Sequence, residues 1–281
     1  MTAVTTINAE AELFWPRLDE RAWERPKTLS IGGYGITRGA ARMLDELATA
    51  GVTATWFFPA WIAEQHPALV RDVAAGGHEI GCLGVDATPL DQLTPDQARD
   101  QLREARDRIT DAAGTECMLV RFPDGKLTEV MIDMAAAAGF TASSSTRAAC
   151  EPITLTTANG TRLVDVPQNW QLTDYPYFIF NTGALAFPPS ESRIAGYDTV
   201  LTEWLDELHA HNDAGLAAVF TFETFCIGTP GRTLLLRKLL AEVTAGPHAT
   251  VSQLAGSYDP AAAPAETGES VRRRWQVGPL E

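Results

Sequence analysis

The stretch Gly51-Val52-Thr53-Ala54-Thr55-Trp56-Phe57-Phe58 decides the fold, because it joins a helix stop to a buried strand. The β-branched and aromatic residues from Val52 to Phe58 are typical of a strand covered on both faces. Residues 39–50 carry apolar side chains at helical spacing, and Gly51 is a typical residue for ending such a helix. A helix, a glycine and a buried strand in this order indicate one unit of an α/β protein.

The same alternation continues in both directions along the chain. Upstream, Thr28–Ile31 runs into Gly32 and Gly33 and is predicted to be the first strand. Downstream, strands are predicted over 78–82, 118–121, 140–143, 163–166 and 216–222, between helices over 66–75, 94–113, 127–138, 198–213 and 230–245. Strands and helices of this length predict βαβ units and a mainly parallel sheet.

Composition narrows the class of partner. The chain has 281 residues, of which 36 are acidic and 22 basic, for a formal charge of −14. This charge argues against nucleic acid or an anionic membrane as a partner, since both attract clustered Lys and Arg. The N-terminal residues lack the apolar core of a secretory signal, and no segment is apolar over the length of a membrane span. We therefore expect a cytoplasmic protein with no membrane partner, whose four cysteines are free thiols.

The predicted elements divide the chain into three parts. Residues 1–27 are set apart as an N-terminal extension, 28–258 as the α/β domain and 259–281 as a C-terminal tail. Within the domain, residues 168–195 are rich in aromatic residues, proline and serine and fall outside the alternation. Long loops of this kind in compact domains usually carry function.

Five segments in order resemble the polysaccharide-deacetylase (NodB-like) superfamily. Gly51–Phe57 is similar to the family's GVKATFF strand, Gly76–Gly81 to its GHEIG segment and Arg121–Gly125 to its RxPxG segment. Trp170–Phe178 is similar to the WxLDDYPYF loop of the branch that cleaves imides and allantoin, and Ile227–Arg232 to the stretch after the last catalytic histidine. The resemblance spans residues 28–245 and implies a distorted (β/α) barrel, in agreement with the strand and helix pattern.

The resemblance also implies chemistry that this sequence does not repeat. Members of the family hydrolyse N-acyl groups and related amides with a divalent metal, held by one Asp and two His, and an Asp base. The paired aspartates fall here on Gly32 and Gly33, the two histidines on Leu83 and Ala87, and the late histidine on Glu223. Glycine, alanine and leucine offer no side-chain ligand, so we expect neither a metal nor another cofactor.

Three residues are candidates for catalysis. Glu223 ends a predicted strand, where a desolvated carboxyl group would have a raised pKa and could serve as general acid or base. Arg121 and Asp124 follow another strand, and Arg121 could bind a substrate oxyanion with its planar guanidinium group. The alternative for Glu223 and Arg121 is a structural ion pair between them.

Five residues are candidates for substrate binding: Tyr34, Asp86, Trp170, Asp174 and Tyr175. Tyr34 follows the positions of the lost aspartates, and the aromatic residues of the 168–195 loop could wall a pocket for a flat molecule. Core packing for the aromatic residues and a turn cap for Asp86 are the competing interpretations. A new metal site built from Asp86, Asp124, Asp174 and Glu223 is a further alternative, although it would lack a histidine.

Two hypotheses for function follow. In the first, the chain is a metal-independent enzyme that acts by general acid–base chemistry on a small cytoplasmic carbonyl, amide or imide metabolite. Lyase, isomerase and cyclase reactions are then as plausible as hydrolysis. In the second, it is an inactive deacetylase homologue that serves as a binding or regulatory module. Both take a small molecule as partner, and both leave a homo-oligomer open.

Overall fold

The structure is a computed structural model that describes residues 2–86, 88, 90, 93–122, 127–147, 149–179, 195–259 and 266–267. The strands are β1 (Ala3–Asn8), β2 (Thr55–Phe58), β3 (Glu79–Cys82), β4 (Leu119–Val120), β5 (Ala142–Ser143), β6 (Ile153–Thr156), β7 (Arg162–Asp165), β8 (Ala218–Glu223), β9 (His248–Ala249) and β10 (Glu266–Thr267). The α-helices are α1 (Phe14–Leu18), α2 (Pro26–Tyr34), α3 (Ala40–Ala50), α4 (Ala60–Gln65), α5 (Pro67–Ala75), α6 (Pro95–Ala113), α7 (Glu129–Ala137), α8 (Tyr175–Phe178), α9 (Tyr197–Ala214), α10 (Pro230–Val243) and α11 (Val251–Ser257).

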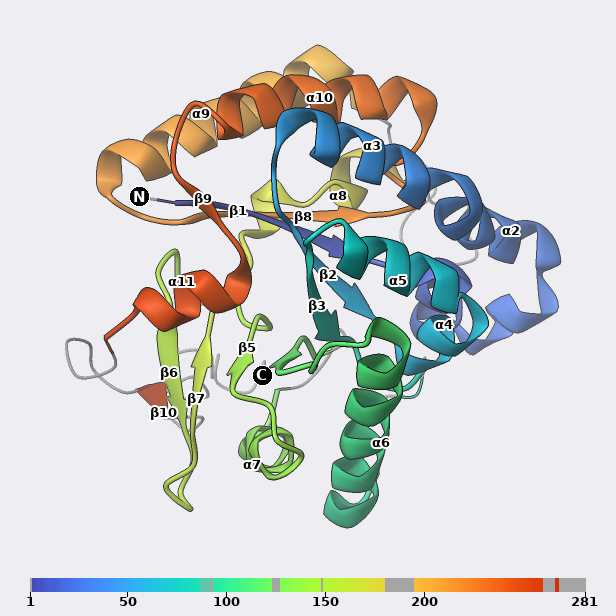
Figure 1. Ribbon diagram of the computed structural model, residues 1–281, viewed down its shortest axis with the longest axis vertical. Coiled ribbons are helices and arrows are strands. Elements are labelled where there is room, and N and C mark those ends of the chain that lie inside the picture. The colour runs from blue at the N-terminus through green and yellow to red at the C-terminus, as the bar shows by residue number, and fades with distance from the viewer. Residues whose placement is uncertain are drawn as a thin grey trace, which may run out of the picture.

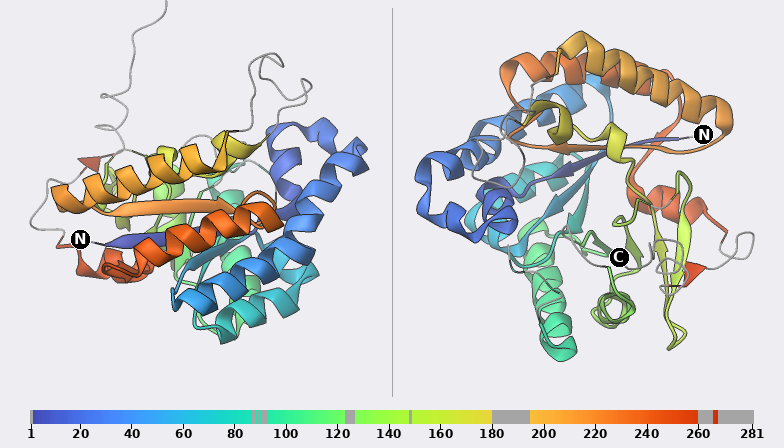
Figure 2. Two further views of the ribbon diagram at one scale, coloured as in Figure 1. Left: turned by 90° about the horizontal axis from the view of Figure 1, so that it is seen from above. Right: turned by 180° about the vertical axis from the view of Figure 1, so that it is seen from behind.

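These strands form one curled, half-barrel sheet with helices around its outer side (Figure 1). The strand order is β10-β6-β7-β5-β4-β3-β2-β1-β8, and β9 pairs with β1. Every pairing is parallel except that of β6 with β7. Helices α9 and α10 run along the β8 edge, as the view from above also shows (Figure 2). The α/β class and the distorted barrel predicted from the sequence are confirmed.

The first strand differs from the prediction. It is β1, which lies between β2 and β8 inside the sheet, so residues 1–27 are more than an extension of the domain. Thr5, Thr6 and Asn8 hide the strand in the sequence, because polar residues at half of its positions are typical of an exposed segment although all are buried here. Thr6 Oγ1 donates a hydrogen bond to the carbonyl oxygen of Phe220 on β8, which is how this polar side chain is satisfied inside the sheet.

Thr28–Ile31, which was predicted to be that strand, belongs instead to helix α2. The helix starts with Pro26 in its first turn, and a π-helical segment, Gly35–Gly39, joins it to α3. Gly32, Gly35 and Gly39 are spaced as one helical face, and each lies against backbone: a Cβ atom at Gly39 would come within 2.2 Å of the Thr224 carbonyl oxygen. The glycines that suggested a turn in fact allow close helix packing.

Two apolar clusters follow from the alternation of side chains across the strands. Outward-facing residues of the sheet, such as Ile7, Trp56 and Phe222, join the helices in the larger cluster. The inward-facing residues form a smaller cluster inside the half-barrel, closed by helix α11: Val4, Phe57, Leu83, Leu119, Ala142, Val166, Val219, Val251 and Ala255.

Most other predicted elements are confirmed within a few residues of their bounds. Thr94 and Gln97 cap α6 through a reciprocal capping box, and Gly51 ends α3 in the left-handed conformation with a φ of 69°. Across the described residues, none of the helices combines the length and the apolar character that crossing a membrane requires.

Gly228 tests the close packing behind the site. A Cβ atom there would lie 2.2 Å from the Thr224 carbonyl oxygen and 2.6 Å from Gly39 Cα. We expect Gly228→Ala to lower the free energy of unfolding by about 1–3 kcal/mol in urea denaturation, because backbone must move to admit the methyl group. In the matched control, Gly256→Ala in α11, nothing lies within 4 Å of the new Cβ atom, and stability should stay equal or rise. Equal effects of the two changes would contradict the packing argument.

Candidate active site

The pocket lies at the carboxyl ends of the strands, where inward-facing positions change from apolar to polar. Val4, Thr6 and Asn8 follow one another on the inner side of β1, and Val219, Thr221 and Glu223 do so on β8. Asn8 and Glu223 are direct neighbours in the β1–β8 register. Ligand sites of parallel α/β sheets occur at this end of the strands.

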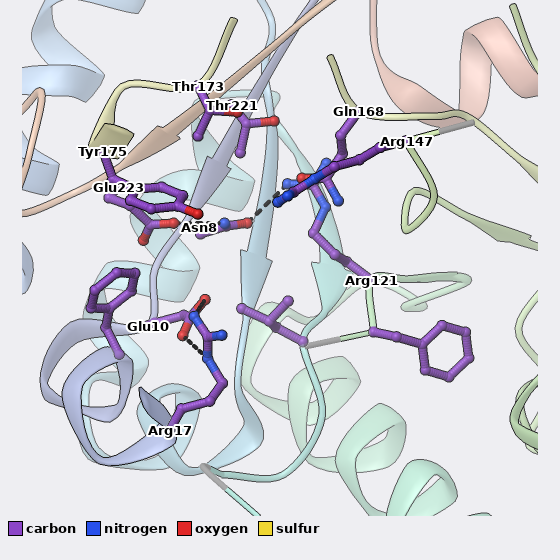
Figure 3. Close-up of a pocket in the computed structure, with 13 residues that line it drawn as sticks. Asn8, Glu10, Arg17, Arg121, Arg147, Gln168, Thr173, Tyr175, Thr221 and Glu223 are labelled. Carbon is purple, nitrogen blue, oxygen red and sulfur yellow. Dashed lines mark hydrogen bonds and ion pairs between the residues drawn. The ribbon is translucent and has the colours of Figure 1, made fainter. Parts of the chain in front are cut away.

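A small cavity of about 30 Å³ lies at this end. Both acidic and basic side chains surround it (Figure 3). Its lining consists of Asn8, Glu10, Phe14, Arg17, Leu83, Arg121, Phe122, Arg147, Gln168, Thr173, Tyr175, Thr221 and Glu223.

Arg121 is a fully buried cation that has no carboxylate in contact among the described residues. Its Nε and Nη2 atoms donate to the carbonyl and hydroxyl oxygens of Ser144, each at 2.8 Å. Its Nη1 donates to Asn8 Oδ1 at 2.9 Å and to Thr6 Oγ1 at 3.2 Å, and the guanidinium carbon lies 3.9 Å from the centre of the Phe57 ring. Burial lowers the pKa of Arg121 to about 9, so the group remains charged at neutral pH.

Glu223 is equally buried, and one of its oxygens has no partner. Oε1 accepts a hydrogen bond of 2.8 Å from Asn8 Nδ2, whereas the buried Oε2 has none. Burial raises the pKa of Glu223 well above its ordinary value, and the neighbouring carboxylates of Glu10 and Asp174 raise it further. Glu223 therefore has the properties of a neutral carboxylic acid in the wall of the cavity.

Asn8 stands between Arg121 and Glu223 and bonds to both. The predicted direct ion pair between these two residues is therefore wrong in its geometry. Sequence reasoning missed Asn8 because it missed strand β1, which Asn8 ends. The signal available was Asn8 itself, a polar residue directly after the apolar residue Ile7.

Glu10 and Arg17 form an ion pair at the cavity, which the sequence analysis also missed. Arg17 Nε donates to Glu10 Oε2 at 2.8 Å and Nη2 to Oε1 at 3.0 Å, a two-pronged geometry that fixes both groups. Both side chains are nearly buried. The pair places a carboxylate close enough to Glu223 to raise the pKa of that residue.

The structure brings only part of the predicted binding set to the cavity. Tyr175 lines it, as expected. Tyr34 instead accepts a hydrogen bond from Arg42 on the neighbouring helix, because its segment is helical and does not follow a strand. Trp170 is 62% exposed and does not line the cavity. The Asp86 carboxylate accepts a hydrogen bond from the Thr88 N–H, as a turn cap does. Asp124 lies outside the described residues.

Asp174 has a structural position rather than a place in the cavity wall. Its carboxylate accepts the backbone N–H groups of Glu223 and Ile227, at 2.9–3.2 Å, and so fixes the turn that follows β8. Burial raises the pKa of Asp174 to about 7, although these hydrogen bonds favour its ionised form. Asp174 thereby orients the backbone that carries Glu223.

The residues present do not fit the metal that the family resemblance implies. Because Thr28–Ile31 is helical, the positions after the first strand are Asn8, Ala9 and Glu10, and neither Gly32 nor Gly33 reaches the cavity. Leu83 lines the cavity where a histidine ligand would stand. Within the described part of the chain, no three His, Cys, Asp or Glu side chains come together as a metal site would require.

The buried thiols offer no alternative nucleophile. Burial raises the pKa of Cys82 and of Cys226 well above the ordinary value, which disfavours the reactive thiolate. All four cysteines are free.

Comparison with known proteins gives a consistent picture. A sequence model of the family described as polysaccharide deacetylase matches residues 32–143. A Mycobacterium smegmatis protein assigned to the polysaccharide deacetylases shares 28% identity, with a TM-score of 0.85 over 95% of this chain and 92% of that one. The PuuE allantoinase has the same fold at 17% identity, with a TM-score of 0.75 over 92% and 91% of the two chains.

A third structural neighbour is described as a pseudoenzyme. It is a family 4 carbohydrate esterase homologue from Bacillus anthracis, with 13% identity and a TM-score of 0.56 over 92% of this chain and 66% of that one. A mutant of that protein is described as having restored enzymatic activity. At this identity the likeness concerns the fold alone.

Asp174 provides a test of how the site is held. We expect Asp174→Ala to lower the free energy of unfolding by about 2–5 kcal/mol in urea denaturation, because it leaves the buried N–H group of Glu223 without an acceptor and removes one of the two acceptors of the Ile227 N–H. The control is Asp111→Ala on the exposed side of α6, which should change stability by less than about 0.5 kcal/mol. A similarly small effect at Asp174 would contradict its structural role.

The raised pKa of Glu223 predicts a pH dependence of stability. The folded state keeps the proton to a higher pH than the unfolded state, in which the carboxyl group titrates near 4.5. The stabilising contribution is thus complete below that value and declines as pH rises toward the folded-state pKa. As pH rises above 4.5, wild-type stability should fall relative to Glu223→Gln, which cannot titrate. A constant difference between the two proteins in denaturant titrations would show that Glu223 has an ordinary pKa.

Proposed function

We propose that this chain, whose residues 32–143 match the family model described as polysaccharide deacetylase and whose fold is of that type, is a metal-independent acid–base enzyme. Its substrate is a small cytoplasmic metabolite with an amide, imide or other carbonyl group. Glu223 is the catalytic acid, and Arg121 holds the Asn8 side chain that donates a hydrogen bond to Glu223. The metal apparatus of the family is absent from this proposal, because the side chains at the strand ends do not suit it.

One observation carries the proposal: Glu223 Oε2 is buried in the cavity wall without a hydrogen-bond partner. A buried polar atom left unpaired costs free energy, and one in the wall of a cavity can recover that cost by bonding to a ligand. Because burial raises the pKa of Glu223 and so favours its neutral form, the carboxyl group can give a proton to a substrate oxygen or nitrogen.

The substrate class follows from the lining and from family resemblance. Polar side chains from Asn8, Gln168, Thr173 and Thr221 surround a narrow space, which suits a compact polar molecule. The segment Trp170–Phe178 resembles the loop of the imide- and allantoin-cleaving branch, and Tyr175 of that loop lines the cavity. A cyclic amide or imide is therefore the substrate we would test first.

A binding or regulatory module is the second candidate. The small cavity favours it, and so does the hydrogen bond from Arg121 to Asn8, which satisfies these polar groups within the protein. The pseudoenzyme with this fold supports it as well, since the family contains members described as inactive. The two candidates differ in one outcome, which is turnover.

The test is a turnover assay on protein dialysed against EDTA. Allantoin, hydantoin, succinimide and an N-acetylated chitooligosaccharide would be incubated with the wild type and with Glu223→Gln, and products followed by NMR. We expect conversion of at least one cyclic amide or imide, reduced about 10²–10⁴-fold in Glu223→Gln because the proton donor is lost. Glu242→Gln, an exposed change on α10, is the matched control and should react like the wild type.

Other outcomes decide against the enzyme. Equal rates for the wild type and Glu223→Gln, or turnover that appears only on adding a divalent metal, would refute metal-independent catalysis by Glu223. Saturable binding of these compounds without conversion, measured by calorimetry, would establish the binding module instead.

A further inference from the structure

The hydrogen bonds around Asn8 have only one consistent direction. Arg121 Nη1 can donate but not accept, so the atom of Asn8 that faces it at 2.9 Å must be the carbonyl oxygen, Oδ1. The amide nitrogen of Asn8 then faces Glu223 Oε1, at 2.8 Å, and donates to it. The buried arginine therefore fixes which way the asparagine amide points.

The same direction passes on to Glu223. A neutral carboxyl group has one carbonyl-type oxygen, which is the better acceptor, and one hydroxyl oxygen, which donates. Since Oε1 accepts from Asn8, the hydroxyl proton belongs on Oε2, the buried oxygen without a protein partner. Figure 3 shows Asn8 between Arg121 and Glu223 at the cavity, with the Asn8 side chain extending toward both.

We propose that Asn8 is a positioning residue that holds the proton of Glu223 on Oε2, so that the pocket binds its ligand through a hydrogen-bond-accepting oxygen. The ligand class is a carbonyl, amide or imide compound whose oxygen meets Oε2–H. This proposal rests on the proposed function in one respect, which is that Glu223 is the acid of the site.

The charges around Glu223 agree with a neutral, donating carboxyl group. Glu10 and Asp174 face it as carboxylates and oppose a further negative charge, whereas Arg17 and the Asn8 amide favour ionisation more weakly. Arg121 acts on Glu223 through Asn8 and makes no direct contact with it. The neighbouring Cys226 is a buried thiol without charge.

An aspartate at position 8 would reverse this arrangement. A carboxylate there could accept from Arg121 but could not donate to Glu223, so the Glu223 proton would turn toward position 8 and away from the cavity. The amide, with one donor end and one acceptor end, is the side chain of this size that satisfies both neighbours and leaves Oε2–H facing the cavity.

Infrared difference spectroscopy tests the proposal without a substrate. The carbonyl-stretch band of a protonated carboxyl group lies apart from carboxylate bands, and the wild type minus Glu223→Gln isolates the band of Glu223. Asn8→Ala and the similarly sized Asn8→Leu, each paired with its own Glu223→Gln double variant, should shift this band to higher frequency. The reason is that the carbonyl oxygen, Oε1, loses the hydrogen bond from Asn8 Nδ2.

Thr6→Val is the matched control. Thr6 also accepts from Arg121 Nη1, but it does not contact Glu223, so the band should remain in place. Circular dichroism would establish that each variant is folded.

The outcomes separate the two levels of the proposal. An unshifted band in both folded Asn8 variants would overturn the positioning role, because the proton would then lie on Oε1. The absence of a protonated band at neutral pH in the wild type would instead refute the proposed acid, Glu223, and with it the enzyme. A shift in Thr6→Val equal to that in the Asn8 variants would also overturn the role of Asn8, since disturbing Arg121 alone would then explain the change.

Discussion

The buried guanidinium group of Arg121 is the constraint on which the rest of the pocket depends. In the part of the chain that the structure describes, no carboxylate contacts it. Neutral oxygens on β1 and on the residue after β5 accept its hydrogen bonds, and the Phe57 ring lies against its charge. Such a group tolerates little movement, because each lost acceptor leaves a buried donor unpaired. Arg121 thereby fixes Asn8, Asn8 fixes Glu223, and Asp174 holds the backbone beneath Glu223.

Most of the fold could be predicted from local patterns, and the exceptions have physical causes. The composition of Thr55–Phe58 predicts a strand, and the capping residues of α6 predict the start of a helix. Strand β1 could not be predicted in this way, because the buried Thr6 is satisfied by a hydrogen bond that only the neighbouring strand supplies. The glycines near residue 32 suggested a turn, yet they serve tertiary contacts with Ala11 and Phe225 that no local pattern records.

The site could be predicted only as far as the strands were. Glu223 and Arg121 were found because they end strands that the sequence identifies, and both lie at the cavity. Asn8 and Glu10 were missed together with β1. Tyr34 was misplaced for the same reason, since it was expected to follow a strand where the chain is helical. For Asp174, sequence indicated a binding residue, whereas its partners are backbone N–H groups far along the chain.

The central claim is that the strand ends present an acid–base pocket in place of the family's metal centre. Elemental analysis of the purified protein, never exposed to a chelator or to a metal-affinity column, tests this most directly. The account predicts zinc, iron, cobalt, nickel and manganese each well below one equivalent per chain, since Leu83 lines the cavity and the described residues hold no cluster of three His, Cys, Asp or Glu side chains. Close to one equivalent of any of these metals, retained through dialysis, would contradict it.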